Sequence, residues 1–190
     1  MNKKKVVVAL TGASGMIYAQ RLFLKLKEEK LNLQVSDIAV ILSDNVKGIW
    51  QNEIEQGNIK DFGFPIYKNN NFYVPFASGS SVYDIMIIIP CSMGTLGRIA
   101  AGTSENLIGR AADVMFKERK RIIFVTREMP LSLIHINNMK TVTESGGIIC
   151  PASPTFYNRP DNLIELVDTV VERVIDLAGL DQEAKRWKND

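Results

Sequence analysis

The sequence is poor in cysteine and histidine: Cys91, Cys150 and His135 are the only such residues among 190. Two cysteines at the ends of apolar runs do not form a disulfide framework, so we expect a reducing, cytoplasmic environment. One histidine, without an Asp-Asp-x-x-Asp-like cluster of carboxylates, argues against a bound metal. The composition therefore favours chemistry performed without a metal ion.

The chain also lacks long apolar runs and a strong charge of one sign. No run approaches the roughly 20 residues of a membrane-spanning helix, and the run Val6 to Leu10 is shorter than the core of a signal peptide, about 7–15 residues. A net charge of +2 argues against nucleic acid as the main partner. With 46% hydrophobic and 23% charged residues, the chain resembles an ordinary globular protein. Its length predicts a single domain spanning 1–190.

Strands and helices alternate along the sequence. Short apolar runs predict strands at 5–10, 37–42, 85–89, 122–126 and 147–150. Longer periodic segments predict helices at 15–29, 44–55, 93–101, 105–118, 131–145 and 161–178. The glycines and prolines between 57 and 79 predict irregular structure. This alternation is typical of an α/β fold with an open parallel sheet, helices on both faces and right-handed crossovers.

Small and hydroxyl-bearing residues follow three of the predicted strands. The segment Thr11 to Gly15 follows the first strand, Ser43 the second, and Cys91 to Leu96 the third. At carboxyl strand ends, such residues let a ligand approach the backbone, and the following helix offers free N–H groups to a phosphate. A tight turn at Thr11 to Gly15 and helix capping by the serines are the alternative interpretations.

Arg127-Glu128-Met129-Pro130 follows the buried strand 122–126. At the carboxyl end of such a strand, an arginine can meet an anion and a glutamate can move a proton. Pro130 is expected in the first turn of the next helix. The alternative is an exposed ion pair between Arg127 and Glu128, which would be energetically weak.

Three further features have simpler interpretations. The basic run Lys117 to Arg121 is typical of the end of a helix, where cations complement the dipole. Cys91 is expected to be a small buried residue rather than a nucleophile, because no base is placed beside it. His135 is expected to be a packed or capped core histidine in the middle of a helix.

Several longer motifs together resemble the UbiX-type flavin prenyltransferases over nearly the whole chain. The motifs are Gly12-Ala13-Ser14-Gly15, Ala77-Ser78-Gly79-Ser80-Ser81, Cys91-Ser92-Met93-Gly94-Thr95-Leu96, Asn106-Leu107-Ile108-x-Arg110-Ala111-Ala112-Asp113-Val114, Lys117-Glu118-Arg119, Arg127-Glu128-Met129-Pro130-Leu131, Ile134-His135, Asn138-Met139 and Pro154-x-Phe156-Tyr157. The resemblance implies a Rossmann-like subunit that binds FMN. It also implies that the dimethylallyl group of dimethylallyl phosphate joins N5 and then C6 of reduced FMN. The product, prenylated FMN, would serve a UbiD-type decarboxylase.

The resemblance also assigns roles to individual residues. FMN would be contacted by Gly12, Ala13, Ser14, Ser43, Ser92, Met93, Gly94, Thr95 and Arg127. The prenyl phosphate would be held by Lys117, Tyr157 and Arg173, with Arg127, Arg110 and Trp187 contributing to the substrate site. Catalytic roles fall to Ser14, Glu53, Lys117 and Glu128. A monophosphate held by cations and a phenol needs no metal, and charge developing on the leaving oxygens suits those groups.

Family members assemble into homo-dodecamers built from trimers, with active sites where subunits meet, so the resemblance implies the same here. It does not decide between quinone synthesis and phenolic-acid breakdown as the pathway served. Three alternatives stay open on the sequence alone. They are a decarboxylase of the phosphopantothenoylcysteine type, an NAD-binding oxidoreductase with Asp44 on the ribose, and a non-catalytic flavin carrier.

Overall fold

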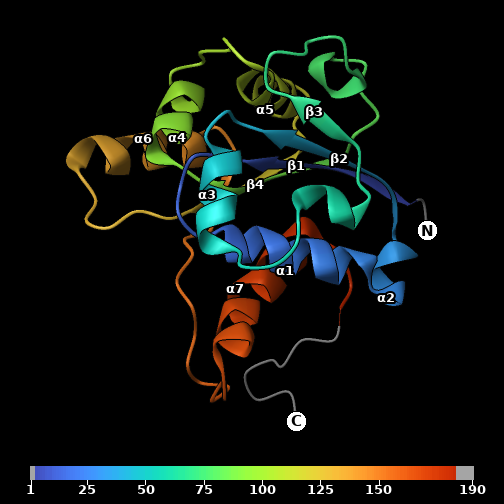
Figure 1. Cartoon of the computed structure of the whole chain (residues 1–190). Helices are drawn as coiled ribbons and strands as arrows, with labels where there is room; N and C mark the ends of the chain where they lie inside the picture. Colours follow the sequence, from blue (N-terminus) through green and yellow to red (C-terminus); the bar gives the residue numbers. More distant parts are fainter. Residues whose placement is uncertain (1–2, 183–190) are drawn as a thin grey trace.

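A six-stranded parallel sheet forms the centre of the computed structural model, which describes residues 3–182 (Figure 1). Its strand order is β3-β2-β1-β4-β5-β6, and every neighbouring pair is parallel. The strands are β1 Lys4–Leu10, β2 Val35–Leu42, β3 Ile66–Lys68, β4 Ile85–Cys91, β5 Arg121–Thr126 and β6 Ile148–Ile149. The predicted α/β class and open parallel sheet are confirmed.

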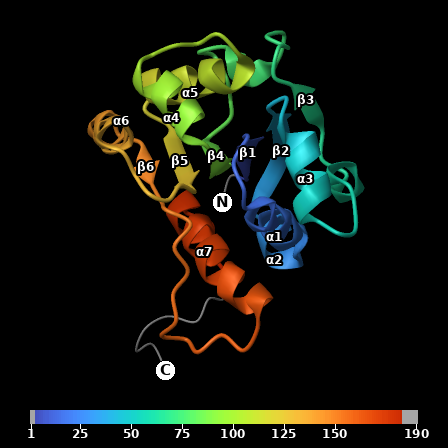
Figure 2. The same cartoon turned by 60° about the vertical axis from the view of Figure 1, so that its left-hand side comes forward.

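Helices cover both faces of this sheet, as predicted (Figures 1 and 2). One face carries α1 Met16–Lys27, α2 Glu29–Asn32, α3 Val46–Glu53 and α7 Leu163–Ala178, and the other carries α4 Met93–Ala100, α5 Leu107–Lys117 and α6 Leu133–Glu144. The residues of β1 alternate between the two cores, with Val6 and Val8 in one and Val7 and Ala9 in the other. Because both faces are covered, β4 is buried at every residue.

Most element boundaries shift by one or two residues from the sequence prediction, and two of the differences bear on the candidate site. Strand β4 continues through Pro90 to Cys91 instead of ending at residue 89. Helix α6 begins at Leu133, so the prediction that Pro130 lies in its first turn is wrong. The reason is a capping box. The Ser132 hydroxyl accepts from the backbone N–H of His135, and the His135 ring accepts from that of Ser132.

The segment predicted to be irregular contains β3 and two short 3₁₀ helices, Ile59–Phe62 and Pro75–Ala77. Residues 69–81 are fastened at three places to α5 and to Lys120, which follows the helix. The backbone N–H of Leu107 donates to the Asn69 carbonyl at 2.7 Å, the Arg110 Nε donates to the Ala77 carbonyl at 2.9 Å, and the Lys120 Nζ donates to the Ser81 carbonyl at 2.5 Å. The segment is therefore ordered by contacts distant in sequence, which local composition does not reveal.

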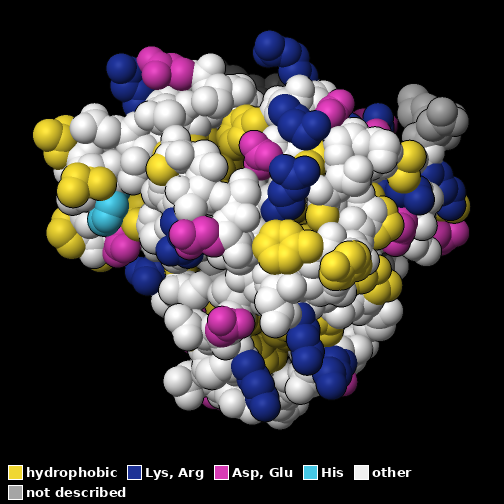
Figure 3. All heavy atoms as spheres, turned by 90° about the horizontal axis from the view of Figure 1, so that it is seen from above, with side chains coloured by type: hydrophobic (Ala, Val, Ile, Leu, Met, Phe, Trp, Pro, Cys, Tyr) yellow, Lys and Arg dark blue, Asp and Glu magenta, His cyan; other side chains and the backbone are white. Residues whose placement is uncertain are grey.

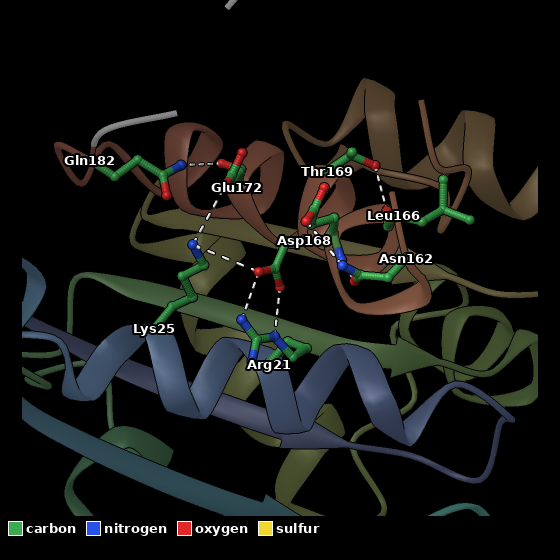
Figure 4. Close-up of polar contacts among 9 residues, drawn as sticks. Arg21, Lys25, Asn162, Leu166, Asp168, Thr169, Glu172 and Gln182 are labelled. Carbon is green, nitrogen blue, oxygen red and sulfur yellow. Dashed lines mark hydrogen bonds and ion pairs between the residues drawn. The ribbon is translucent and has the colours of Figure 1, made fainter. Parts of the chain in front are cut away.

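An ion-pair network joins α1 to α7 (Figure 4). Arg21 donates two hydrogen bonds to the Asp168 carboxylate, at 2.7 and 2.6 Å, and Lys25 Nζ lies 3.3 Å from a Glu172 oxygen. Burial raises the pKa of Glu172, and the neighbouring Lys25 partly opposes that shift. This network fixes the position of α7, while the loop before α7 and the first turns of the helix extend away from the sheet (Figure 2).

Across residues 3–182, the structure contains no helix that combines the length and the apolar character needed to cross a membrane.

Candidate active site

Four strand ends with candidate ligand-binding residues lie side by side at the carboxyl edge of the sheet. Since the order in the sheet is β2-β1-β4-β5, the residues after these strands follow one another as Ser43, Gly12, Ser92 and Arg127. The register agrees, because Leu10 pairs with Leu42 and Cys91 with Thr126. The predicted gathering of these loops at one edge is therefore confirmed.

The Thr11 side chain connects the loop after β1 to the end of β4 and the loop that follows it. Its fully buried hydroxyl donates to the Pro90 carbonyl at 2.8 Å and accepts from the Ser92 backbone N–H at 2.8 Å. On the other side, the Ser43 backbone N–H donates to the Leu10 carbonyl at 3.0 Å. Sequence reasoning gave Thr11 no role of its own. The only signal for it is a hydroxyl placed directly after a buried strand.

Glu53 caps the N-terminus of α1 from the end of α3. One of its carboxylate oxygens accepts from the backbone N–H groups of Gly15 and Met16, both at 2.8 Å. Gly15, at φ 111°, is the N-cap residue and has no side chain to provide a cap. The prediction that the first N–H groups of this helix are free for a phosphate is therefore wrong for Gly15 and Met16. The acceptor is 38 residues away in sequence, so local inspection could not find it.

Other backbone donors at this edge have no protein acceptor within residues 3–182: the N–H groups of Gly12 and Ser14, and those of Met93 and Gly94 in the first turn of α4. The Ser92 hydroxyl caps the Thr95 N–H at 3.3 Å, as the capping interpretation predicted. Ala13, Met93 and Thr95 are buried, whereas Gly12, Ser14 and Gly94 are exposed. Two adjacent loops thus offer donors to an anion or to a polar ring edge.

Arg127 reaches from β5 across to the loop after β1. Its Nε donates to the Ser14 carbonyl at 3.2 Å, and its charge opposes the rise that burial causes in the pKa of Tyr18. Glu128 is exposed and accepts from the backbone N–H of Met129 at 3.1 Å. In the described part of the chain, Arg127 and Glu128 do not pair with each other, so the interpretation as a surface ion pair is wrong. Both groups remain available to a ligand.

A cleft of about 590 Å³ opens beside Ser43, between the ends of β2 and β3 and the start of α5. Lys47 and Lys68 line it together with the carboxylates of Asp44 and Glu105, so its charges balance. This cleft extends the candidate site along the carboxyl edge from β2 to β3.

Lys117 lies at the opposite edge of the sheet. The start of α5 touches Asn69, just after β3 ends, while Lys117 is its last residue, shortly before β5 begins. Eleven residues of helix rise about 16 Å. There the Lys117 Nζ pairs with a Glu118 carboxylate oxygen at 3.0 Å. One chain therefore does not bring Lys117 to the loops of its own carboxyl edge.

The other candidate substrate residues lie on three different parts of the chain. Arg110 donates to the Ala77 carbonyl and pairs with Asp113 at 3.0 Å. Tyr157 is 49% exposed on the loop before α7, and Arg173 is exposed on α7 itself. Trp187 lies outside the described residues.

The cysteine and histidine predictions have different outcomes. Cys91 is fully buried and burial raises its pKa to about 12, which confirms a packing residue rather than a nucleophile. His135 does cap a helix, but the expected core position in mid-helix is wrong. It lies in the first turn of α6 between Ile134 and Ile136, which are 70% and 49% exposed. Figure 3 shows the histidine at the surface among hydrophobic side chains.

Within residues 3–182, no cluster of three or more histidine, cysteine, aspartate or glutamate side chains is arranged to hold a metal ion.

The fold and the strand-end loops together define a flavoprotein of the α/β class, and the family model named Flavoprotein matches residues 1–178. A flavin prenyltransferase UbiX from Methanocaldococcus jannaschii is 41% identical over 186 residues, covering 96% of this chain and 98% of the relative. Among solved structures, AnUbiX (PadA1) in complex with FMN and dimethylallyl pyrophosphate superposes with a TM-score of 0.89 at 35% identity, covering 98% of this chain and all of that one.

A dodecameric FMN-dependent UbiX-like decarboxylase from Escherichia coli O157:H7 gives a TM-score of 0.90 at 36% identity, covering 97% of this chain and all of that one. The chain belongs to the UbiX flavin prenyltransferase family, and it is accordingly a transferase enzyme.

Proposed function

We propose that this chain, acting as one domain, transfers the dimethylallyl group of dimethylallyl phosphate to N5 and C6 of reduced FMN. The prenylated FMN would then serve a UbiD-type decarboxylase. The observation that carries the proposal is the carboxyl edge, where backbone donors without acceptors and Arg127 lie on adjacent loops. The relative solved with FMN and dimethylallyl pyrophosphate supports this choice of substrates.

The residues at this edge fit FMN chemically. Unpaired N–H groups suit phosphate oxygens or ring carbonyls, and the Arg127 guanidinium suits either. Because Glu53 already accepts from Gly15 and Met16, we assign the FMN phosphate to the donors of the neighbouring loops. The contacting residues would be Gly12, Ala13, Ser14, Ser43, Ser92, Met93, Gly94, Thr95 and Arg127. When bound, the reduced flavin supplies the nucleophile.

We propose that neighbouring copies complete the site. Because Lys117 lies at the far end of α5, its ammonium would serve another copy, and the exposed Tyr157 and Arg173 suit the same role. The dodecameric relative supports an assembly of this kind. The C–O bond of the prenyl phosphate breaks with its electron pair on the phosphate. Cations and the Tyr157 phenol would stabilise that charge, with Arg110 and Trp187 contributing to the substrate site.

We propose that the proton transfers are performed by the carboxylates of Glu128 and Glu53 and by the Ser14 hydroxyl. Glu128 is exposed and, within residues 3–182, accepts a hydrogen bond only from the neighbouring Met129 N–H, so its second oxygen remains available to take a proton from the substrates. Ser14 lies on the loop that Arg127 contacts. For Glu53, the two hydrogen bonds to α1 support a role in holding this loop, alongside the proton-transfer role that the family resemblance implies.

We further propose that the reaction is metal-independent and takes place in the cytoplasm, without nucleic acid or membrane as partner. A monophosphate held by Lys117, Tyr157 and Arg173 has its charge balanced by protein groups. Prenyl transfer measured with and without EDTA tests the first point. Full activity in EDTA is expected, and an activity that returns only on adding Mg²⁺ would overturn it.

The central experiment is anaerobic incubation with reduced FMN and dimethylallyl phosphate, followed by mass analysis of the flavin. We expect a product heavier by one five-carbon unit. Lys117→Ala and Glu128→Gln should abolish it while FMN remains bound, whereas the exposed control Lys140→Ala should not. A co-assembled mixture of the two inactive variants should recover part of the activity, because some sites then receive both intact groups. An unchanged flavin mass, also with a diphosphate donor, would identify a flavin carrier and reject the proposal.

A further inference from the structure

A second cleft lies at the amino edge of the sheet, on the side opposite the candidate flavin site. Its volume is about 650 Å³, and it lies between the starts of β1, β4, β5 and β6 and the end of α7. Four cationic side chains and one carboxylate line it: Lys4, Arg119, Lys120, Arg121 and Asp84. None of these five residues has a role in the proposed transfer reaction.

The positive charge in this cleft is not balanced by the protein. In the described part of the chain, neither Lys4, Arg119 nor Arg121 forms an ion pair with a carboxylate. The ends of α5 and α7 each contribute about half a negative charge, and Asp84 contributes one more. Four cations exceed that total by about two charges. The two helix ends and Asp84 therefore balance only part of the positive charge of the four cations.

Arg119 adds an independent observation. Its φ of 53° places it in the left-handed region, just after α5, at the position where a helix usually ends with glycine. Its backbone N–H donates to the Phe116 carbonyl at 3.0 Å, and that of Lys120 donates to the Met115 carbonyl at 2.8 Å, as in a Schellman motif. An arginine here is strained, and strained residues concentrate at sites of function.

The neighbouring cations are held in place by their surroundings. Lys120 donates to the Ser81 carbonyl, which fixes its ammonium at the rim of the cleft. The Arg121 guanidinium lies against Gly179 at the end of α7, where a side chain on residue 179 would collide with it. Asp84 is already engaged, because its carboxylate accepts from the Lys5 N–H at 2.9 Å. Three of the five charged groups, those of Lys120, Arg121 and Asp84, are thus in place before any ligand arrives.

We propose that this cleft binds a phosphoryl group, either as free phosphate or on a small molecule, at a site separate from the flavin site. One arginine guanidinium group can donate hydrogen bonds to two oxygens of the same phosphate, and lysine ammonium groups add positive charge. A phosphate carries about two negative charges at neutral pH, close to the unbalanced positive charge of the cleft.

The test is thermal unfolding of the intact protein with inorganic phosphate, pyrophosphate or dimethylallyl phosphate, each at matched ionic strength in NaCl. At ten times its Kd, a bound probe should raise Tm by about 3–5 °C. The double variant Arg119→Gln with Arg121→Gln should lose this rise while keeping bound FMN. Equal rises with all three probes would show that the phosphoryl group alone is recognised. A rise with dimethylallyl phosphate only that is lost in the double variant would show a holding site for the prenyl donor in this cleft. Either result supports the site when the double variant abolishes the rise, whereas a rise that persists in the double variant belongs to the flavin site.

Arg119→Gly provides a sharper control, because glycine relieves the left-handed strain. This variant should unfold about 1–2 °C higher than the parent without phosphate, yet gain less from phosphate. Arg159 is the matched control, since it is also exposed with a positive φ, 50°, and does not line the cleft. Arg159→Gly should keep the full response to phosphate. The proposal is overturned if no probe raises Tm of the parent, or if the Arg119 and Arg121 variants respond as the parent does.

Discussion

Replacing Glu53 separates two roles that its carboxylate could have. Glu53→Ala removes the side chain that caps α1, leaving the N–H groups of Gly15 and Met16 without an acceptor among residues 3–182. Losing an N-terminal cap typically costs about 1 kcal/mol, and losing the charge near the helix dipole costs about 0.3–1 kcal/mol. Because Glu53 is exposed and water replaces part of the interaction, we expect a total loss of about 1–2 kcal/mol.

Thermal unfolding of the flavin-free protein measures this loss. For a chain of this length, about 1–2 kcal/mol lowers Tm by about 3–6 °C. Glu53→Gln keeps a neutral oxygen that can accept the same hydrogen bonds, so its Tm should fall by less than about 2 °C. The control is Glu55→Ala, which removes an exposed carboxylate two residues later and should leave Tm unchanged.

The same variants should differ in FMN affinity. Glu53→Ala should weaken FMN binding by about ten-fold, because the loop from Gly12 to Gly15 loses its anchor, while Glu53→Gln should bind nearly as the parent. Prenyl transfer then tests proton transfer separately. A Glu53→Gln variant that is stable and binds FMN but is inactive would assign the carboxylate to proton transfer. A Tm for Glu53→Ala equal to that of Glu55→Ala would refute the capping argument.

Three further predictions concern buried groups. Asp168→Asn should lower stability by about 2–3 kcal/mol in urea unfolding, because Arg21 keeps a largely buried charge without its partner, and an unchanged midpoint would contradict this. Burial raises the pKa of Glu172 despite the neighbouring Lys25, so the folded state holds this proton more tightly than the unfolded state does. Ionisation of Glu172 therefore costs stability as pH rises through its folded pKa. The parent should lose stability relative to Glu172→Gln as pH rises above about 4.5, the ordinary pKa of a glutamate, and a difference independent of pH would contradict the shift. Cys91, with a pKa raised to about 12, should resist iodoacetamide at pH 8 until the protein unfolds, whereas labelling of the folded protein would show that it is accessible.

The sequence was sufficient for features that depend on local pattern. The apolar runs identified five of the six strands, and the loops after them were expected at one sheet edge because parallel strands place their carboxyl ends together. Strand β3 was missed because it has only three residues, none of them fully buried, between glycine, proline and asparagine residues. Pairing with β2, rather than its own composition, makes it a strand.

The candidate site was predictable in its residue types but not in its connections. Glu53 reaches α1 across 38 residues, and Thr11 reaches Pro90 across 79, so neither contact leaves a local signal. The position of Lys117 followed from the length of α5 and the direction of the chain, which only the folded topology makes plain. The family motifs alone place Lys117 beside Arg127, although within one chain the two residues lie at opposite edges of the sheet.

Three hydrogen bonds attach residues 69–81 to α5 and to Lys120 just after it, and they predict how this part of the molecule moves. A segment fastened at its beginning, middle and end cannot separate from the helix one hydrogen bond at a time, so the two should open together. In native-state hydrogen exchange, the amides of residues 69–81 should therefore exchange with the same free energy of opening as those of α5. A segment that is mostly loop would then share the slow opening of the helix beside it.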